Sequence, residues 1–235
     1  LLDSCMLRKF FHRWFFCTFA GALLLLSAGC NTTRYLKDDE LLLVKNEIVL
    51  TDAKDVKNKG KLSYELTTLY KQRPNTKFFF VPRQWFYYRS NAPEDTTGFK
   101  KWQRRRLAEA PAILNDTLTR RTEEQMTYYL NYLGYFQAKA EHEVIQKGRH
   151  KAEVRYYVAP GEVVRIDTVH FSSADTAIHR ELQAIHSETV FQKGAPLEGR
   201  LYDLEKERIA KHLRSNGYAY FYSNSFAELD ADTTE

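Results

Sequence analysis

The residue types that carry enzyme chemistry are present, but they do not form a catalytic pattern. The chain has no His-Glu-x-x-His, no Gly-x-Ser-x-Gly and no phosphate-binding loop. Glu141, His142 and Glu143 are consecutive in a predicted strand, where alternate side chains point to opposite faces, so the three do not converge. His179 and His186 are seven residues apart, without further ligands to complete a metal site. We therefore expect a protein that is not an enzyme and holds no metal and no cofactor.

The residues before Cys30 predict a chemical modification of this cysteine. Basic side chains lie in residues 8–13, an apolar run fills residues 14–26, and Ser-Ala-Gly immediately precedes the cysteine. A run of 13 residues is shorter than the ~20 that a membrane-spanning helix needs. This order resembles a bacterial lipobox, which implies cleavage before a cysteine whose thiol is lipidated. We predict a signal peptide over 1–29 and a lipidated tether over 30–38. The alternatives are an ordinary signal peptide with an incidental cysteine and a short uncleaved anchor.

The cleavage also decides the thiol chemistry of the mature chain. Cys5 and Cys17 leave with the signal peptide, and Cys30 is acylated, so neither a disulfide nor a cysteine nucleophile remains. The length of 235 residues corresponds to one or two domains at ~100–200 residues each. The contents of 43% hydrophobic and 28% charged residues exclude a disordered or collagen-like chain. With its only long apolar run near the N-terminus, the chain is also not a polytopic helical membrane protein.

The mature chain predicts a β-α-α-β-β unit over residues 39–160. Apolar residues indicate a strand over 40–50, and the spacing of Leu62, Leu66 and Leu69 predicts a helix over 62–72. A second helix is predicted from Asp116 or Thr117 to Leu133, with Gly134 after its end. Alternating runs at 135–145 and 151–158 around Gly148 predict a hairpin. An aromatic and basic insertion occupies 77–115.

The same order of elements begins again over residues 161–235. It predicts a strand at 163–171, helices at 177–185 and 197–216, and a strand at 218–229. Leu130-x-x-x-Gly134-Tyr135 matches Leu213-x-x-x-Gly217-Tyr218 at an offset of 83 residues, at which Leu118 also meets Leu201 and Met126 meets Ile209. The two halves therefore indicate an internal repeat, with an incomplete second copy.

A β-α-α-β-β unit whose second helix ends in Gly-Tyr resembles the POTRA (polypeptide-transport-associated) domain. Tandem copies precede the barrel in the BamA and TamA family of outer-membrane assembly factors. With the lipobox, the Pro-Asn-Thr-Lys segment at 74–77 and the insertion, the chain looks most like the lipoprotein form of that family, TamL. The resemblance implies an α+β fold of tandem POTRA-like modules behind a lipoprotein signal peptide, at the outer membrane with the modules in the periplasm. The second module lacks its third strand and no barrel follows, so we expect a fragment of a longer protein.

The resemblance further implies binding of client or partner polypeptides by strand addition. The implied partners are outer-membrane protein clients and a periplasm-spanning or other assembly partner, with membrane attachment through the lipid anchor and the missing barrel, and no nucleic acid. In the family topology the third strand lies between the first and second, so the second strand is the edge. The candidate edge residues are Tyr135, Phe136, Gln137, Lys139, Glu141 and Glu143. Their charges serve equally well to protect a solvated edge from aggregation. The other class of function is a stand-alone periplasmic lipoprotein acting as a binding module or scaffold.

The segment 77–106 has eight basic and two acidic residues, a net charge of +6, and it also contains clusters of aromatic residues. Nucleic-acid binding fits that composition but not a signal peptide. Since most large aromatic side chains are buried, core packing of Phe78 to Phe80, Trp85 and Leu107 is the first interpretation. The second is a membrane or partner surface. Its candidate residues are Trp85, Lys100, Lys101, Trp102, Arg104, Arg105 and Arg106.

Overall fold

The computed structural model describes residues 32–90 and 98–226. The predicted signal peptide, the lipidation site Cys30 and the last residues of the predicted strand 218–229 lie outside this range. The described residues form two compact units: the first contains 32–46, 72–114 and 144–153, and the second contains 47–71, 115–143 and 154–226. A short 3-10 helix, Thr32–Tyr35, begins the described chain.

A three-stranded sheet in the order β1-β5-β4 is the main β element. Its strands are β1 (Leu42–Leu50), β4 (Lys139–Gln146) and β5 (Lys151–Ala159). The Leu42 amide donates to His150 and the Thr51 amide to Val158, so β1 runs parallel to β5, whereas β4 and β5 form a hairpin. The third predicted strand therefore lies in the middle, as the resemblance implied, and β4 lies at the edge.

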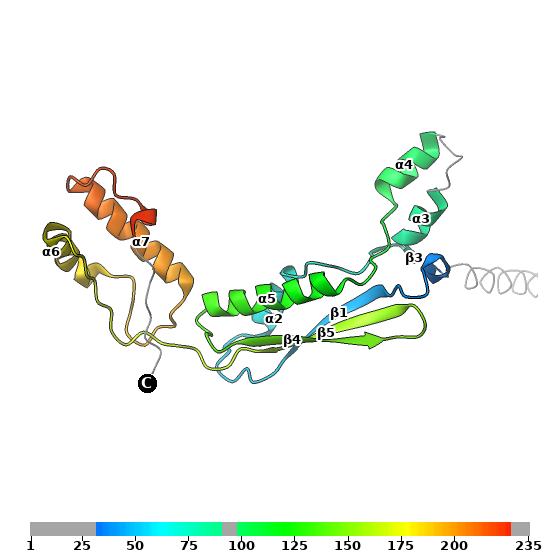
Figure 1. The fold of residues 1–235 in the computed structure, drawn as a ribbon, viewed down its shortest axis with the longest axis horizontal. Helices are drawn as coiled ribbons and strands as arrows, with labels where there is room; N and C mark the ends of the chain where they lie inside the picture. Colours follow the sequence, from blue (N-terminus) through cyan, green and yellow to red (C-terminus); the bar gives the residue numbers. More distant parts are fainter. Residues whose placement is uncertain (1–31, 91–97, 227–235) are drawn as a thin grey trace, which may run out of the picture. The chain divides into compact units, whose positions relative to one another are not determined.

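Helices α2 (Lys59–Thr68) and α5 (Asp116–Tyr132) pack on one face of this sheet, as Figure 1 shows. β5 alternates strictly, with Ala152, Val154, Tyr156 and Val158 buried. Leu66 of α2 and Met126 and Leu130 of α5 are fully buried. The Tyr156 hydroxyl hydrogen-bonds with Thr122 and Thr119 of α5, and burial raises its pKa above the usual value. The module is therefore a two-layer α+β structure.

Three of the predicted boundaries in this module were wrong for local reasons. Helix α2 begins earlier than 62 because Asn58 caps it, with its side chain accepting from the Lys61 amide at 2.9 Å. The same helix ends before 72, and the Lys71 amide donates to Thr122 instead. Helix α5 begins at Asp116, one of its two predicted starts, and Asn115 caps it. Strand β4 begins at Lys139 and not at Tyr135, because Tyr135 to Ala138 form a turn in which the Ala138 amide donates to Tyr135.

The insertion folds into a small hairpin and two short helices. Strands β2 (Lys77–Phe78) and β3 (Val81–Pro82) pair antiparallel, with Phe78 opposite Val81. Helices α3 (Arg83–Ser90) and α4 (Gly98–Arg106) follow and contact each other. The Arg83 guanidinium donates to the carbonyls of Leu107 and Arg106, and Tyr88 of α3 stacks on Tyr35 with ring centroids 4.3 Å apart. These contacts hold the insertion within the first unit.

The predicted second repeat unit contains helices α6 (Thr176–Ala184) and α7 (Gly199–Ser215) but no strand among residues 160–226. The predicted strand at 163–171 was wrong: only residues 164–166 pair, with 194–197, around the bridge between Arg165 and Pro196. The predicted strand at 218–229 was also wrong over its described part, where 3-10 turns such as Ser223–Ser225 replace it. Four aromatic residues pack instead against the buried Leu182 and Ile185 at the end of α6 and against Ile209 and Leu213 of α7; they are Phe171, Tyr218, Phe221 and Phe226.

The long helices of the two predicted repeat units match in length and position. Helices α5 and α7 each have 17 residues, and their bounds coincide at the predicted offset of 83. Both end in a Schellman motif, in which Tyr135 and Tyr218 donate to Leu130 and Leu213 at 3.0 Å. The glycines before them have φ of 93° and 97°, the left-handed conformation that this motif needs.

Candidate binding surfaces

The edge strand β4 is the first candidate surface. Lys139, Glu141 and Glu143 are exposed on it, whereas the predicted edge residues Tyr135, Phe136 and Gln137 lie in the preceding turn and are not part of the strand. The outer edge of β1 is partly covered, since the Leu43 amide donates to Ala112 and the Leu114 amide to Leu41. Among the described residues, no strand pairs with the outer edge of β4. Its unpaired main-chain groups are therefore available to an added strand.

The hydrogen-bond register of β4 identifies which residues direct these groups outward. The Lys147 amide donates to the Lys151 carbonyl at 2.7 Å, so position 147 bonds toward β5. Main-chain groups alternate in direction along a strand. The amides and carbonyls of Ala140, His142 and Val144 therefore point away from β5. The side chain of Val144 is itself 40% exposed.

Side chains fix the position of this edge strand on both of its faces. On the helix face, His142 Nδ1 lies 2.7 Å from Glu123 Oε1 of α5. On the opposite face, the Tyr157 hydroxyl donates to Glu143 Oε2 at 2.9 Å. A strand held from both sides presents its outer edge in one geometry, which lowers the entropic cost of pairing with an incoming chain.

A row of polar side chains crosses all three strands on the face opposite the helices. Arg155 Nε of β5 donates to Glu47 Oε2 of β1 at 2.9 Å, and Arg155 also hydrogen-bonds with Tyr157. The hydrogen bonds to Glu47 and Tyr157 raise the pKa of the Arg155 guanidinium above its usual value. Arg155 and Tyr157 were not among the predicted site residues, although they alternate with the buried residues of 152–158 in the sequence. The row can orient the sheet edge.

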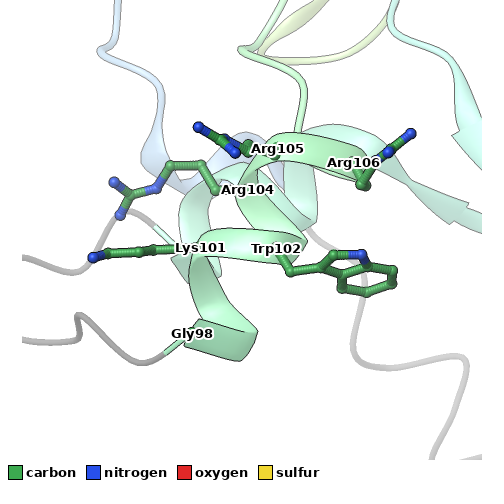
Figure 2. Close-up of a pocket in the computed structure, with 6 residues that line it drawn as sticks. All are labelled: Gly98, Lys101, Trp102, Arg104, Arg105 and Arg106. Atoms are coloured by element: carbon green, nitrogen blue, oxygen red, sulfur yellow. The ribbon is translucent and has the colours of Figure 1, made fainter.

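The second candidate surface lies on α4. Figure 2 shows Lys101 and Arg104 pointing to one side of the helix and Trp102 and Arg106 to the other. Together with Gly98 and Arg105 they line an open hollow of about 550 Å³. Phe99 stacks on Trp102 at 5.9 Å between ring centroids, and these two side chains are 68% and 51% exposed. The structure therefore brings Lys101, Trp102 and the three arginines together on one short helix; Lys100 lies on the same helix and Trp85 on α3.

The aromatic residues before α3 do not form the expected core. Phe79 and Phe80 are the two central residues of the turn between β2 and β3, and their side chains are 81% and 92% exposed. Phe78 is also 42% exposed, so the interpretation of Phe78 to Phe80 as core was wrong, whereas Trp85 and Leu107 are half-buried. Phe79 has φ of 54°, a conformation that costs a side-chain-bearing residue about 1–2 kcal/mol. The signal in the sequence was the absence of any alternating or helical period in Phe78-Phe79-Phe80-Val81-Pro82.

Across residues 32–90 and 98–226, no helix combines the length and the apolar character needed to cross a membrane. No protein-family model and no curated protein matches the chain. The solved structures that match include the crystal structure of POTRA domains 3–5 of BamA from Haemophilus influenzae, at 13% identity and a TM-score of 0.35. The alignment covers 76% of this chain and 51% of that one, so this chain spans about half the length of the solved protein.

Proposed function

We propose that this chain is a POTRA-type binding module of an outer-membrane assembly or translocation factor, and that it binds extended polypeptides by strand addition to β4. The carrying observation is the sheet order β1-β5-β4, which leaves β4 with an unpaired outer edge. Main-chain hydrogen bonds do not depend on the partner's side chains, so such an edge suits clients of many sequences. The proposed activity is binding and not catalysis.

The order of elements supports the POTRA assignment. Between β1 and β5 the chain forms α2, α5 and β4, with the insertion of β2, β3, α3 and α4 between the two main helices. Both main helices lie on one face of the sheet (Figure 1). The matched 17-residue helices α5 and α7 support a second copy of the same unit.

The proposed location follows from the N-terminal sequence. Lipidation of Cys30 attaches the chain to a membrane, and a signal peptide places the modules in the periplasm. The clients are then unfolded outer-membrane proteins, whose strands alternate apolar and polar residues over about ten positions. A lipoprotein of the TamA type is the specific form that we propose.

The test uses the substitution Val144→Pro. Its amide points away from β5, so proline removes an outward donor without breaking a hydrogen bond within the sheet. The probe is a fluorescent peptide of about ten residues that alternates valine or phenylalanine with threonine or lysine. We expect fluorescence polarisation to show binding to the unmodified chain and an affinity about tenfold lower for the proline variant, the equivalent of one or two main-chain hydrogen bonds.

The matched control is Val144→Thr, which keeps the amide and a β-branched side chain. We expect it to bind the peptide as the unmodified chain does. Circular dichroism and thermal melting check that both variants are folded. Equal affinity of the two variants for the peptide, or no binding to any form of the chain, would contradict strand addition at β4.

A further inference from the structure

The turn between β2 and β3 combines two features that the fold alone does not explain. A two-residue hairpin turn with positive φ at its first central position normally has glycine there. Here that residue is Phe79, with φ of 54°, and the next is Phe80. Both side chains are more than four-fifths exposed. The backbone of the turn is therefore strained, and no burial of its two largest side chains offsets that strain. Phe79 contacts Phe78 edge-to-face, with ring centroids 4.9 Å apart, which holds the apex together.

The surroundings of this turn are cationic. Residues 77–90 and 98–106 contain eight basic and no acidic residues. Lys77 and Arg83 flank the hairpin, and the Arg83 guanidinium donates to the carbonyls of Leu107 and Arg106 at the end of α4. The hairpin and the cationic end of α4 are therefore joined within the first unit.

Helix α4 repeats the same combination of apolar and basic groups. Trp102 and Arg106 lie on one side of the helix, with Phe99 stacked on Trp102, and Lys101 and Arg104 lie on the other (Figure 2). The helical spacing places Arg105 with Lys101 and Arg104. An exposed short helix with aromatic residues on one side and Lys or Arg on the other is typical of a helix that lies in a membrane interface. Tryptophan in particular favours the headgroup level of a bilayer.

We infer that residues 77–90 and 98–106 form a docking surface for an anionic lipid bilayer. Phe79 and Phe80 enter the acyl region at the apex of the hairpin, Phe99 and Trp102 lie at the headgroup level, and Lys101, Arg104 and Arg105 contact anionic headgroups. The inference does not rest on strand addition at β4. A bilayer accounts for both observations at once, since it buries the two apolar rings and neutralises the cations around them. Single-stranded nucleic acid would also use the cations and would stack its bases on the exposed rings, but it does not fit the predicted signal peptide.

The test places an environment-sensitive fluorophore on the apex. The full chain carries C5S, C17S and C30S, so that a single cysteine at position 80 (F80C) takes the label. A matched chain carries the label at R149C, in the turn between β4 and β5. Both labelled chains keep residues 1–31, so any contribution of that segment to vesicle binding is the same in the two. We expect vesicles of phosphatidylethanolamine and phosphatidylglycerol to shift the emission at position 80 to the blue and to leave it unchanged at position 149.

Two variants of the labelled chain separate the apolar contribution to vesicle binding from the electrostatic contribution. Phe79→Gly should raise the lipid concentration for half-maximal response about tenfold, the value of one buried phenylalanine. Its melting temperature should stay equal or rise, because glycine relieves the positive φ, so misfolding is excluded. Replacing Arg104, Arg105 and Arg106 by Gln should raise that concentration roughly a hundredfold. Unchanged emission at position 80 with anionic vesicles, an equal response to phosphatidylcholine vesicles, or a response to oligodeoxythymidine alone would overturn the inference.

Discussion

Helices α5 and α7 are equal in length and end in the same Schellman motif, yet their surroundings differ. Leu130 of α5 is buried in the layer between α2, α5 and the sheet, and Leu213 of α7 is buried against Leu182, Ile185 and Ile209 with aromatic residues around them. No strand lies beside α7 among residues 160–226. The comparison shows that one local sequence can end a helix identically in two places, while the next residues become a strand only where a neighbouring strand pairs with them.

The same comparison extends to the contact between the two helices of each repeat. Tyr129 of α5 hydrogen-bonds with Glu65 of α2. The position 83 residues later, His212 of α7, lies 2.9 Å from Glu181 of α6. Both repeats therefore join their helices through a glutamate on the first helix, with a tyrosine partner in one copy and a histidine partner in the other.

The largest expected effect on the free energy of unfolding comes from substituting the two buried leucines, Leu130 and Leu213. Leu130→Ala should lower the free energy of unfolding by about 2–5 kcal/mol, since it leaves a cavity in a core closed by a sheet. Leu213→Ala should cost about 2 kcal/mol, because the smaller cluster around it relaxes more easily. Urea denaturation with hydrogen exchange measures both. An equal loss of protection in the two repeats for both variants would show that the repeats are one cooperative unit and would break the comparison.

Gly134 and Gly217, the glycines of the two Schellman motifs, have nearly the same backbone conformation, so substituting them compares their surroundings more directly than substituting the two leucines. Gly217→Ala should destabilise by about 1–2 kcal/mol, the cost of a left-handed alanine, because nothing lies within 4 Å of the added Cβ. Gly134→Ala should cost more, since its Cβ would lie 3.1 Å from the Leu197 carbonyl oxygen. Thermal melting of the two variants checks the order. A larger shift for Gly217→Ala would contradict the contact between Gly134 and Leu197.

The smallest expected effect concerns Tyr129 at alkaline pH. Burial, with the hydrogen bond to Glu65, raises the pKa of Tyr129 from 10.0 to about 12. The folded state therefore keeps the phenol proton that the unfolded state loses near pH 10, so this stabilisation is present below pH 10 and is lost as the pH rises to about 12.

In Tyr129→Phe, the free energy of unfolding should fall less steeply across that range. Denaturant titrations between pH 9 and about 12 give the slope. Tyr128→Phe is the control, because the neighbouring Tyr128 side chain is 70% exposed. An identical pH dependence of the free energy of unfolding in the two variants would show that Tyr129 does not cause the loss of stability at alkaline pH.

Much of the first module was predictable from its sequence. The period of Leu118, Met126 and Leu130 and the glycine at 134 located α5 to within a residue, and the alternation in 151–158 located β5. These patterns depend only on residues close together in the chain, so the two elements can be predicted from the sequence alone. The exposed apex at Phe79 and Phe80 was missed, because three consecutive phenylalanines suggest a buried core and outweighed the missing period of residues 78–82.

By itself, the sequence of this chain determined the long helices α5 and α7 and the glycine stops at their ends, because caps, glycines and periodicity act over a few residues. Only the tertiary structure decided which apolar runs became strands, since a strand needs a partner far away in the sequence. It placed β5 between β1 and β4, turned residues 218–226 back onto α6 and α7, and left Phe79 and Phe80 uncovered. The physical reason is that a helix satisfies its own main-chain hydrogen bonds, whereas a strand satisfies them only through its neighbours.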